Sequence, residues 1–329
     1  MTKIKEIFEF LKPDLSKIDQ IILEFSVGKS PLIEEIAHHL ISSGGKRIRP
    51  ILLVLSSKMC DENAKNYHNL ASAIELIHTA TLLHDDVVDN SFVRRGKKTA
   101  NSIWDNKASI LVGDFVFSIA FQLMVKSNNL KVLDLLAKTS SVMADGEVMQ
   151  LENSSNIEIS QEKYFDIIFA KTAVLFSAAC ETPALFYEKS EKEISALKNF
   201  GKNLGIIFQI IDDILDYSSS AAQLGKEVGD DFFEGKITLP IILAYEKASQ
   251  DDKIIIKNLF EENLMNQEKN QENFAKILEL LEKYQALQES YDLAFKYKNS
   301  AIEYLSIFPD SIYKNYLLEI LQYSLERTK

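Results

Sequence analysis

The sequence has few of the residues that end or redirect secondary structure. Its 329 residues include 11 glycines and 6 prolines, which is about one residue in twenty, whereas average usage of the two is roughly 12%. Collagen-like chains, low-complexity segments and loop-rich β folds all need many more turn formers. The composition therefore excludes these classes.

Cysteine and positive charge are scarce as well. Cys60 and Cys180 lie in apolar stretches and form no C-x-x-C pair, so we expect neither a disulfide framework nor a thiolate zinc site. The 37 basic residues are outnumbered by 48 acidic ones, which gives a net charge of −11. Because nucleic-acid affinity depends on Lys and Arg displacing counterions from phosphates, we expect no nucleic acid as a general partner. An acidic chain can still hold a small basic site.

Long hydrophobic runs are also missing. Residues 1–12 mix Lys, Glu, Phe and Ile at helical spacing and contain no uninterrupted apolar segment of the kind found in signal peptides. No apolar run reaches the ~18–20 residues that cross a bilayer. We therefore expect no transmembrane segment and a cytoplasmic protein.

The sequence does contain helical periodicity along almost its whole length. Apolar residues recur three or four positions apart, and strict alternation is rare. We expect helices over residues 67–89, 109–127, 132–152, 161–185, 191–216 and 239–247, with further amphipathic helices over 274–327. Because no stretch resembles an interdomain linker, the sequence predicts an all-α fold with a single domain over residues 1–329.

Three segments, 110–125, 206–215 and 238–244, are apolar on nearly every face. Such helices are normally buried, so other helices must surround them. The sequence therefore predicts a thick helix bundle whose interior can hold a cavity. The more charged C-terminal helices, residues 250–329, are expected to pack on its outside.

Two acidic clusters are set into this apolar pattern. Both read D-D-x-x-D, and they comprise Asp85, Asp86 and Asp89, and Asp212, Asp213 and Asp216. The first and last Asp of each cluster share a helix face, where like charges destabilise a helix, and half-buried carboxylates need a cation nearby. All-oxygen ligands indicate a hard cation such as Mg²⁺, which binds one or two carboxylates together with substrate phosphates. Two such clusters facing each other would hold a diphosphate through Mg²⁺.

Basic residues gather around the two acidic clusters. Residues 44–50 read GGKRIRP, residues 94–98 read RRGKK, and Lys226 and Lys236 each follow a glycine, while Lys171 lies inside an apolar helix. Glycine lets a backbone approach an anion closely, and Arg forks match phosphate oxygens. We therefore expect these residues to contact phosphate groups.

With these motifs the sequence resembles the trans-isoprenyl diphosphate synthases, also called polyprenyl synthetases. The order GGKRIRP, D-D-x-x-D, RRG, D-D-x-x-D and GKITLP is that family's order, and it covers about residues 35–245. The resemblance implies the isoprenoid synthase fold, an all-α bundle around a deep central cavity. It also implies a reaction in which an allylic diphosphate (geranyl, farnesyl or geranylgeranyl) ionises, isopentenyl diphosphate attacks the carbocation, and a proton is lost.

The resemblance also implies roles for single residues. Ligands for two or three Mg²⁺ ions are expected at Asp85, Asp89 and Asp212, with Asp86 and Asp216 as further ligands or partners of the ligands. Contacts to the allylic diphosphate are expected from Arg94, Lys171 and Lys226, with Thr172 beside them and Gln209 as a partner of the diphosphate or of a metal-bound water. The isopentenyl diphosphate site is expected at Lys46, Arg49, His78 and Arg95. Asp231 and Lys236 fall in a loop that is expected to close over the substrates.

One departure and two small residues bear on product length. Residues 146–150 read GEVMQ where short-chain members often carry G-Q-x-x-D, and this version resembles long-chain synthases. Ala80 and Thr81 lie five and four residues before Asp85, and neither would block a growing chain. Moving the cavity floor by one helical turn, roughly 5.4 Å, changes the product by about one isoprene unit. We expect a product of about C30 to C40 for a quinone side chain, with Phe115, Phe117 and Phe121 as candidates for the floor.

Other functions fit parts of the pattern. A short-chain synthase (C15–C20) shares every motif except the length signals. A terpene cyclase shares the fold and the first cluster, but typically carries an Asn/Ser/Glu metal motif in place of the second. A non-catalytic subunit that tunes a partner's product length predicts degraded aspartate motifs, whereas both are intact here. The resemblance also implies a homodimer, with residues 110–125 as part of the interface or of the core.

Overall fold

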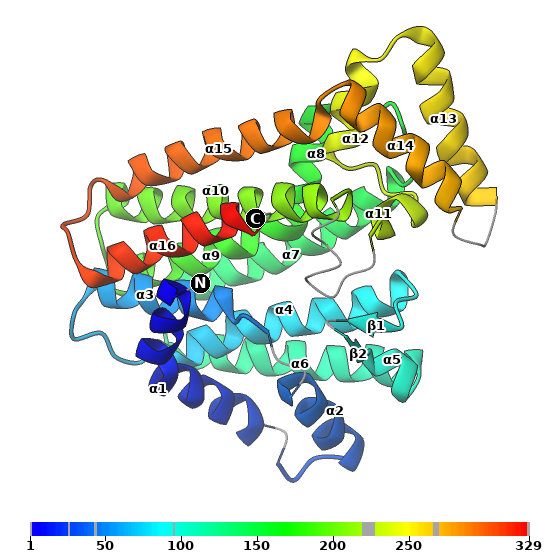
Figure 1. The fold of residues 1–329 in the computed structure, drawn as a ribbon. Helices are drawn as coiled ribbons and strands as arrows, with labels where there is room; N and C mark the ends of the chain where they lie inside the picture. Colours follow the sequence, from blue (N-terminus) through cyan, green and yellow to red (C-terminus); the bar gives the residue numbers. More distant parts are fainter. Residues whose placement is uncertain are drawn as a thin grey trace. The chain divides into compact units, whose positions relative to one another are not determined.

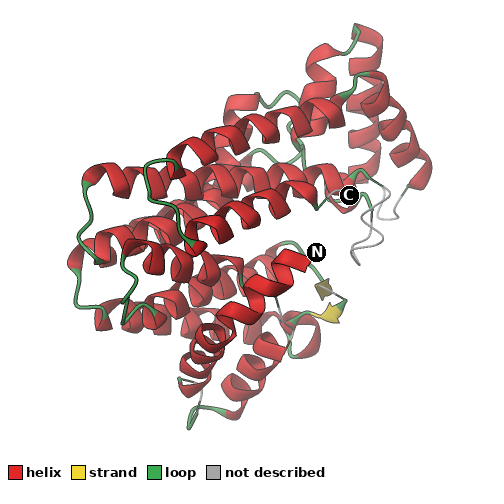
Figure 2. Ribbon diagram, turned by 60° about the vertical axis from the view of Figure 1, so that its left-hand side comes forward, coloured by secondary structure: helices red, strands yellow, loops and turns green. Residues whose placement is uncertain are grey.

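A computed structural model describes residues 2–25, 27–42, 45–94, 96–218, 228–265 and 270–327 (Figure 1). Helices dominate these ranges, in which a hairpin of two-residue strands provides the only sheet (Figure 2). The predicted all-α fold is therefore confirmed. The chain divides into two compact units: the first comprises Met1–Ser140, Leu175–Gly201 and Tyr304–Ile320, and the second comprises Ser141–Val174, Lys202–Glu303 and Leu321–Lys329.

The first unit contains α1 (Thr2–Glu24), α2 (Pro31–Ser42), α3 (Ile48–Cys60), α4 (His68–Val88), β1 (Val93–Arg94), β2 (Lys97–Lys98), α5 (Ala100–Ile103) and α6 (Asn106–Lys126). The second contains α8 (Gln161–Ile168), α11 (Asp230–Phe233), α12 (Leu239–Lys247), α13 (Gln250–Met265) and α14 (Gln271–Lys283). Residues of both units occur in α7 (Leu130–Glu152), α9 (Val174–Phe186), α10 (Glu191–Asp216), α15 (Ala286–Leu305) and α16 (Ile312–Glu326).

Helices α4 and α6 pack side by side in the first unit (Figure 1). Asp105 caps the start of α6, since its Oδ1 accepts a hydrogen bond of 2.8 Å from the backbone N–H of Ala108. Ser109 donates to the carbonyl of Leu83 at 2.9 Å. At Gly113 an added Cβ would lie 2.3 Å from Nε2 of His84, so a side chain there would displace this imidazole. The contacts of α6 with Leu83 and His84 lie in the last turns of α4, where the first acidic cluster also lies.

The prediction that α6 is buried is wrong for one face. Val112, Val116 and Ile119 belong to the core, but Leu111 is 66% exposed and Val125 is 62% exposed. Composition alone does not show that the helices packed against α6 leave one of its sides exposed. By contrast, residues 238–244 and most of residues 206–215 are buried as predicted.

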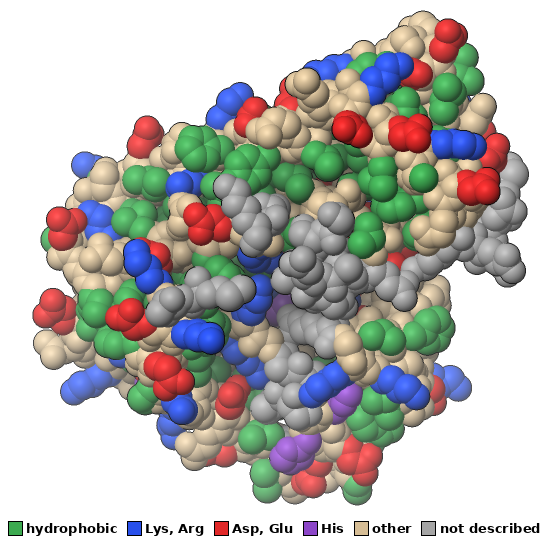
Figure 3. All heavy atoms as spheres, viewed as in Figure 1, with side chains coloured by type: hydrophobic (Ala, Val, Ile, Leu, Met, Phe, Trp, Pro, Cys, Tyr) green, Lys and Arg blue, Asp and Glu red, His purple; other side chains and the backbone are tan. Residues whose placement is uncertain are grey.

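Two helical segments are long and apolar enough to cross a membrane by length and composition alone, which leaves the expectation of no transmembrane segment a prediction. They are Asn106–Lys126 and Gln161–Phe186. Of the 18-residue apolar stretch in each, 44% is buried in the first segment and 89% in the second. The core helix of a globular protein meets the same criterion, and the second segment fits that description. Charged side chains of both signs are spread over the face drawn in Figure 3.

The helix predicted over residues 161–185 is interrupted. A π-helical turn, Phe169–Ala173, separates α8 from α9 and contains Lys171. Such turns insert an extra residue into a helix and occur frequently at functional sites. Apolar periodicity does not resolve a one-residue insertion, so the sequence predicted a continuous helix.

Candidate active site

The first acidic cluster occupies the end of α4. The backbone N–H of Asp89 donates to the carbonyl of Asp85 at 2.8 Å, so these two residues lie one helical turn apart, as their spacing predicted. Both are half-buried, whereas Asp86 is buried. The C-terminal end of a helix carries partial negative charge, and three carboxylates there add to it. The arrangement therefore favours binding of a cation.

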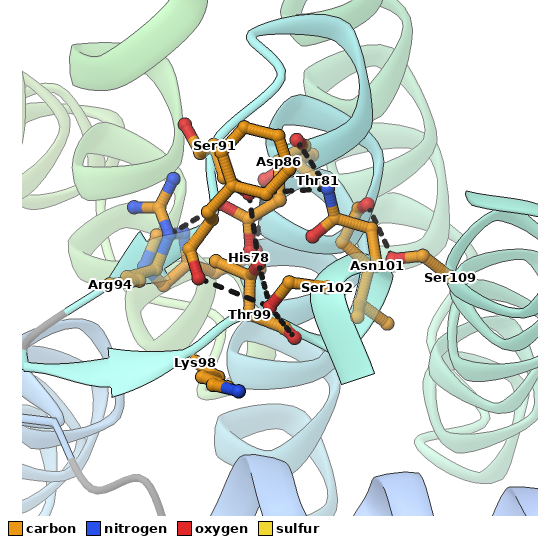
Figure 4. A network of polar contacts seen from close by, with 12 residues as sticks. His78, Thr81, Asp86, Ser91, Arg94, Lys98, Thr99, Asn101, Ser102 and Ser109 are labelled. Atoms are coloured by element: carbon orange, nitrogen blue, oxygen red, sulfur yellow. Dashed lines mark hydrogen bonds and ion pairs between the residues drawn. The ribbon is translucent and has the colours of Figure 1, made fainter. Parts of the chain in front are cut away.

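Asp86 pairs with Arg94, which reaches it from β1 (Figure 4). Nε of Arg94 donates to Oδ1 of Asp86 at 2.8 Å. Burial raises the pKa of Asp86, and the guanidinium of Arg94 opposes that rise. The side-chain amide of Asn101 also donates to the carbonyls of Asp86 and Ser91, at 3.0 and 3.2 Å. Asp86 therefore anchors Arg94 and the loop that follows α4.

A pocket of about 610 Å³ in the first unit brings some of the predicted residues together. His78, Asp86 and Arg94 line it, together with Arg47 and Lys98. Lys46 is exposed, and Arg49 places its guanidinium 4.4 Å from the ring centroid of Phe176 instead. The pocket wall is mixed in charge but rich in donors, and such a wall suits an anionic ligand.

Sequence reasoning passed over Arg47, which lies between the two basic residues that it selected. Arg47 precedes α3 in the left-handed region, with φ 44°. Its guanidinium pairs with Glu75 and, at 3.2 Å, with Asp19. Burial lowers the pKa of Arg47, but the two carboxylates outweigh burial and raise it. The signal in the sequence was the buried acidic Glu75 in an apolar stretch of α4.

The residues that were expected to set product length occupy different surroundings. Ala80 is buried, and the hydroxyl of Thr81 donates to the carbonyl of His78 at 2.9 Å. A second pocket in the first unit, about 520 Å³ and largely apolar, is lined by neither of them but includes Phe115. Among the three aromatic candidates for the cavity floor, only Phe115 lines this pocket. Phe117 and Phe121 instead pack edge to face, with ring centroids 5.2 Å apart.

The second acidic cluster ends α10 in the second unit. Asp213 is 2% exposed and accepts hydrogen bonds from Tyr164 at 2.6 Å, Gln209 at 2.9 Å and the backbone N–H of Leu239 at 3.4 Å. Burial and the nearby charge of Asp231 raise the pKa of Asp213 and the three donors oppose the rise, which leaves it at about 7. The middle aspartate of this cluster is therefore committed to internal hydrogen bonds.

The outer aspartates of the second cluster have contacts that the sequence did not reveal. Oδ1 of Asp212 lies 3.1 Å from Nη2 of Arg327, whose guanidinium covers the ring of Phe208 at 3.9 Å. Oδ2 of Asp216 accepts a hydrogen bond of 3.1 Å from the backbone N–H of Asp231. Asp212 therefore already has a cationic partner, and that partner comes from the far end of the sequence.

Lys171 and Thr172 lie together in the π-helical turn of the second unit. Nζ of Lys171 pairs with Oε2 of Glu147 at 2.8 Å, and the hydroxyl of Thr172 donates to Oε1 of Gln209 at 2.9 Å. At Gly146 an added Cβ would lie 2.7 Å from the backbone nitrogen of Lys171. The close approach of α7 therefore fixes the position of the turn that carries both predicted residues.

Three further predictions concern the loop after α10 and the hairpin. Lys226 and Arg95 lie outside the described residues. Lys236 pairs with Glu234 at 2.6 Å. The structure therefore places most of the predicted diphosphate contacts, but not these two.

Both acidic clusters suit a hard divalent cation, because their donors are carboxylate oxygens without His or Cys. Within the described ranges, no three His, Cys, Asp or Glu side chains converge closely enough to hold a metal by themselves. Mg²⁺ is typically held by one or two carboxylates, with water and substrate phosphates completing its coordination. The residues present therefore fit Mg²⁺ with a diphosphate.

Comparison with known proteins places these features in context. The sequence profile of the polyprenyl synthetase family matches residues 30–281. The chain is 37% identical over 327 residues to an octaprenyl diphosphate synthase of Haemophilus influenzae, with 99% of this chain and 98% of that protein covered. It is also similar to the crystal structure of a decaprenyl diphosphate synthase from Rhodobacter capsulatus, with a TM-score of 0.93, 37% identity and 99% of each chain covered. A polyprenyl synthase from Caulobacter crescentus, complexed with calcium and isoprenyl diphosphate, gives a TM-score of 0.92 at 38% identity, over 99% of this chain and 98% of that one.

Proposed function

The chain belongs to the polyprenyl synthetase family and is a long-chain prenyltransferase, and we propose that it extends an allylic diphosphate to a product of about C30 to C40. The substrates are an allylic diphosphate and successive molecules of isopentenyl diphosphate, and the product serves as the side chain of a quinone. The observation that carries this proposal is the pair of aspartate clusters, each at the C-terminal end of an apolar helix and each with a basic partner nearby.

The family uses a divalent metal, and the proposal assigns two or three Mg²⁺ ions to this chain. Asp85 and Asp89 on α4, and Asp212 with Asp216 on α10, would hold them. When bound, Mg²⁺ supplies positive charge to the departing diphosphate. The same carboxylates orient the diphosphate indirectly, because each occupies a fixed place at the end of its helix.

Basic side chains bind the two diphosphates and stabilise the negative charge that develops on ionisation. Arg94 and Lys171 are assigned to the allylic diphosphate, and each is already held by one carboxylate, Asp86 or Glu147. Preorganised cations of this kind lower the barrier because they need little rearrangement as charge develops. His78 lies with Arg94 at the same pocket and is assigned to isopentenyl diphosphate together with Lys46, Arg49 and Arg95. Lys226 is assigned to the allylic diphosphate by its motif.

The reaction proceeds by ionisation, condensation and elimination. The C–O bond of the allylic diphosphate breaks and its electrons leave with the diphosphate. The alkene of isopentenyl diphosphate then attacks the allylic carbocation, and a proton passes to the released diphosphate. Apolar walls exclude water, which would quench the carbocation. The apolar stretches of α4 and α6 in the first unit supply such walls.

Incubation of the purified protein with farnesyl diphosphate, labelled isopentenyl diphosphate and Mg²⁺ tests the proposal. We expect label in a polyprenyl product, and chromatography would give its length. A product of C15 to C20 would instead support the short-chain alternative, and a cyclised hydrocarbon without incorporation would support a terpene cyclase. A folded protein that incorporates label only when a second protein is added would support the subunit hypothesis.

The exposed face of α6 favours a homodimer. Ile110, Leu111 and Val125 are large apolar side chains exposed on this helix, and exposed apolar surface favours association. A second copy of the chain would cover them.

A cytosolic location is also part of the proposal, because the more buried of the two apolar segments, Gln161–Phe186, already packs within the protein.

A further inference from the structure

A chain of hydrogen bonds links four side chains from three elements of the second unit. The hydroxyl of Thr172, in the π-helical turn, donates to Oε1 of Gln209 on α10 at 2.9 Å. Nε2 of Gln209 donates to Oδ1 of Asp213 at 2.9 Å, and the hydroxyl of Tyr164 on α8 donates to Oδ2 of Asp213 at 2.6 Å. The donor and acceptor of each bond are fixed, because the amide oxygen of Gln209 can accept from Thr172 only while its NH₂ faces Asp213.

Burial makes this chain of bonds costly to rearrange. Tyr164 is 4% exposed, Asp213 is 2% exposed and Thr172 is also buried. A buried donor or acceptor that loses its partner keeps the full cost of its desolvation. Burial beside Asp213 also raises the pKa of Tyr164 well above its usual range, so its hydroxyl remains a donor. The hydroxyl of Tyr164 therefore holds Asp213, and Asp213 holds the amide of Gln209.

The hydrogen-bonded side chains are sequence neighbours of residues that we assign to the diphosphate and the metal. Thr172 follows Lys171 directly, and Gln209 and Asp213 flank Asp212 on α10. An apolar side chain of similar volume would pack α8 against α10 without the desolvation cost of a buried carboxylate. The desolvation cost of burying Asp213 has a purpose if its carboxylate keeps the amide of Gln209 and the hydroxyl of Thr172 in one orientation.

We propose that Tyr164 is a positioning residue for the prenyl transfer, because its bond to Asp213 fixes the amide of Gln209 and through it the hydroxyl of Thr172. This inference rests on the proposed function. Asp213 serves the same purpose and leaves Asp212 and Asp216 to the metal. Tyr164 itself touches neither substrate nor metal.

Replacement of Tyr164 by Phe removes only the hydroxyl. We expect kcat to fall about tenfold, the scale of one buried hydrogen bond, while KM for isopentenyl diphosphate stays unchanged. Tyr284→Phe is the matched control, since Tyr284, which directly follows α14, also donates to a carboxylate, that of Asp252 on α13 of the same unit. It should leave both constants at the wild-type values.

A double-mutant cycle separates positioning from a purely structural role. Thr172→Val acts at the other end of the chain of bonds, so Tyr164→Phe combined with Thr172→Val should lower kcat little more than the larger single change. Two losses that multiply, or a Tyr164→Phe variant with wild-type kcat, would overturn the inference.

If Tyr164→Phe fails to fold, as judged by circular dichroism, the isosteric Asp213→Asn carries the test, because a carboxamide has only one accepting oxygen and cannot accept from both Tyr164 and Gln209 as the carboxylate does. An unchanged kcat in Asp213→Asn would overturn the inference equally. A wild-type protein without Mg²⁺-dependent incorporation would refute the proposed function itself.

Discussion

Arg47 holds the start of α3 in a conformation that few side chains adopt. Its left-handed backbone places the guanidinium between Asp19 on α1 and Glu75 on α4, in largely buried surroundings. Left-handed conformations of residues other than glycine are strained, and they persist where the surroundings hold them in place. The ion pairs at Arg47 therefore set the path of the segment that carries Lys46 and Arg49.

Replacement of Arg47 by Met should destabilise the protein strongly. The change leaves Glu75 buried without its cation, and breaking a buried pair in this way typically costs about 3–5 kcal/mol. The free energy of unfolding in urea is the measurement. Lys138→Met is the control, since it breaks an exposed pair with Asp134 and should change stability by less than ~0.5 kcal/mol. Equal stabilities of the two variants would contradict the assignment.

A buried carboxylate ties α1 to α3 and α4 at the scale of elements. Asp14 on α1 accepts hydrogen bonds from Tyr67 at 2.7 Å and from His68 at 2.9 Å, and it pairs with Lys58 at 3.1 Å. Burial raises the pKa of Asp14, but His68, Tyr67 and Lys58 together lower it to about 2. The docking of α1 therefore depends on an ionised Asp14.

The pH dependence of stability tests this tie. Because the folded pKa of Asp14 lies below the ordinary value of 3.8, the unfolded chain binds more protons between those values. Its contribution is present above pH ~4 and is lost as pH falls towards ~2. Asp14→Asn should therefore show a shallower loss of unfolding free energy over this window than the wild type. Parallel profiles would show that Asp14 does not hold α1.

The contact between α7 and the π-helical turn gives a second prediction for elements. Gly→Ala inside a helix normally stabilises by ~1 kcal/mol. At Gly146 the sign should reverse, because the added Cβ would lie 2.7 Å from the backbone nitrogen of Lys171 and 2.8 Å from Cβ of Ala170. We expect Gly146→Ala to lower both the melting temperature and kcat. A higher melting temperature with full activity would show that the turn can move without loss.

Local patterns in the sequence predicted what depends on near neighbours. The helices over residues 191–216 and 239–247 were predicted with the bounds that α10 and α12 have, because their apolar spacing is regular. The clusters at Asp85 and Asp212 were found because i,i+4 carboxylates stand out in apolar helices. Contacts between distant residues were missed: Arg47 with Glu75, 28 residues away, and Arg327 with Asp212. Spacing also cannot show which face of α6 meets solvent.

At the scale of the whole molecule, the exposed face of α6 predicts self-association. Leu111→Glu places a charge among exposed apolar side chains, so burying this face against a second copy becomes unfavourable. Sedimentation velocity should show a dimer for the wild type and a monomer for Leu111→Glu. Val27→Glu is the control, because Val27 is 73% exposed and lies outside α6; it should remain dimeric. A wild-type monomer, or a dimeric Leu111→Glu, would contradict the proposed interface.

The central claim is that both acidic clusters serve one metal-dependent prenyl transfer. The most direct measurement compares Mg²⁺-dependent incorporation of labelled isopentenyl diphosphate by the wild type, Asp85→Asn and Asp212→Asn. We predict a labelled long-chain product from the wild type and at least a ~100-fold loss in either variant, the scale of losing charge stabilisation in a transition state, with helicity unchanged. Wild-type incorporation by a folded Asp85→Asn or Asp212→Asn protein, or the same rate with and without Mg²⁺, would contradict it.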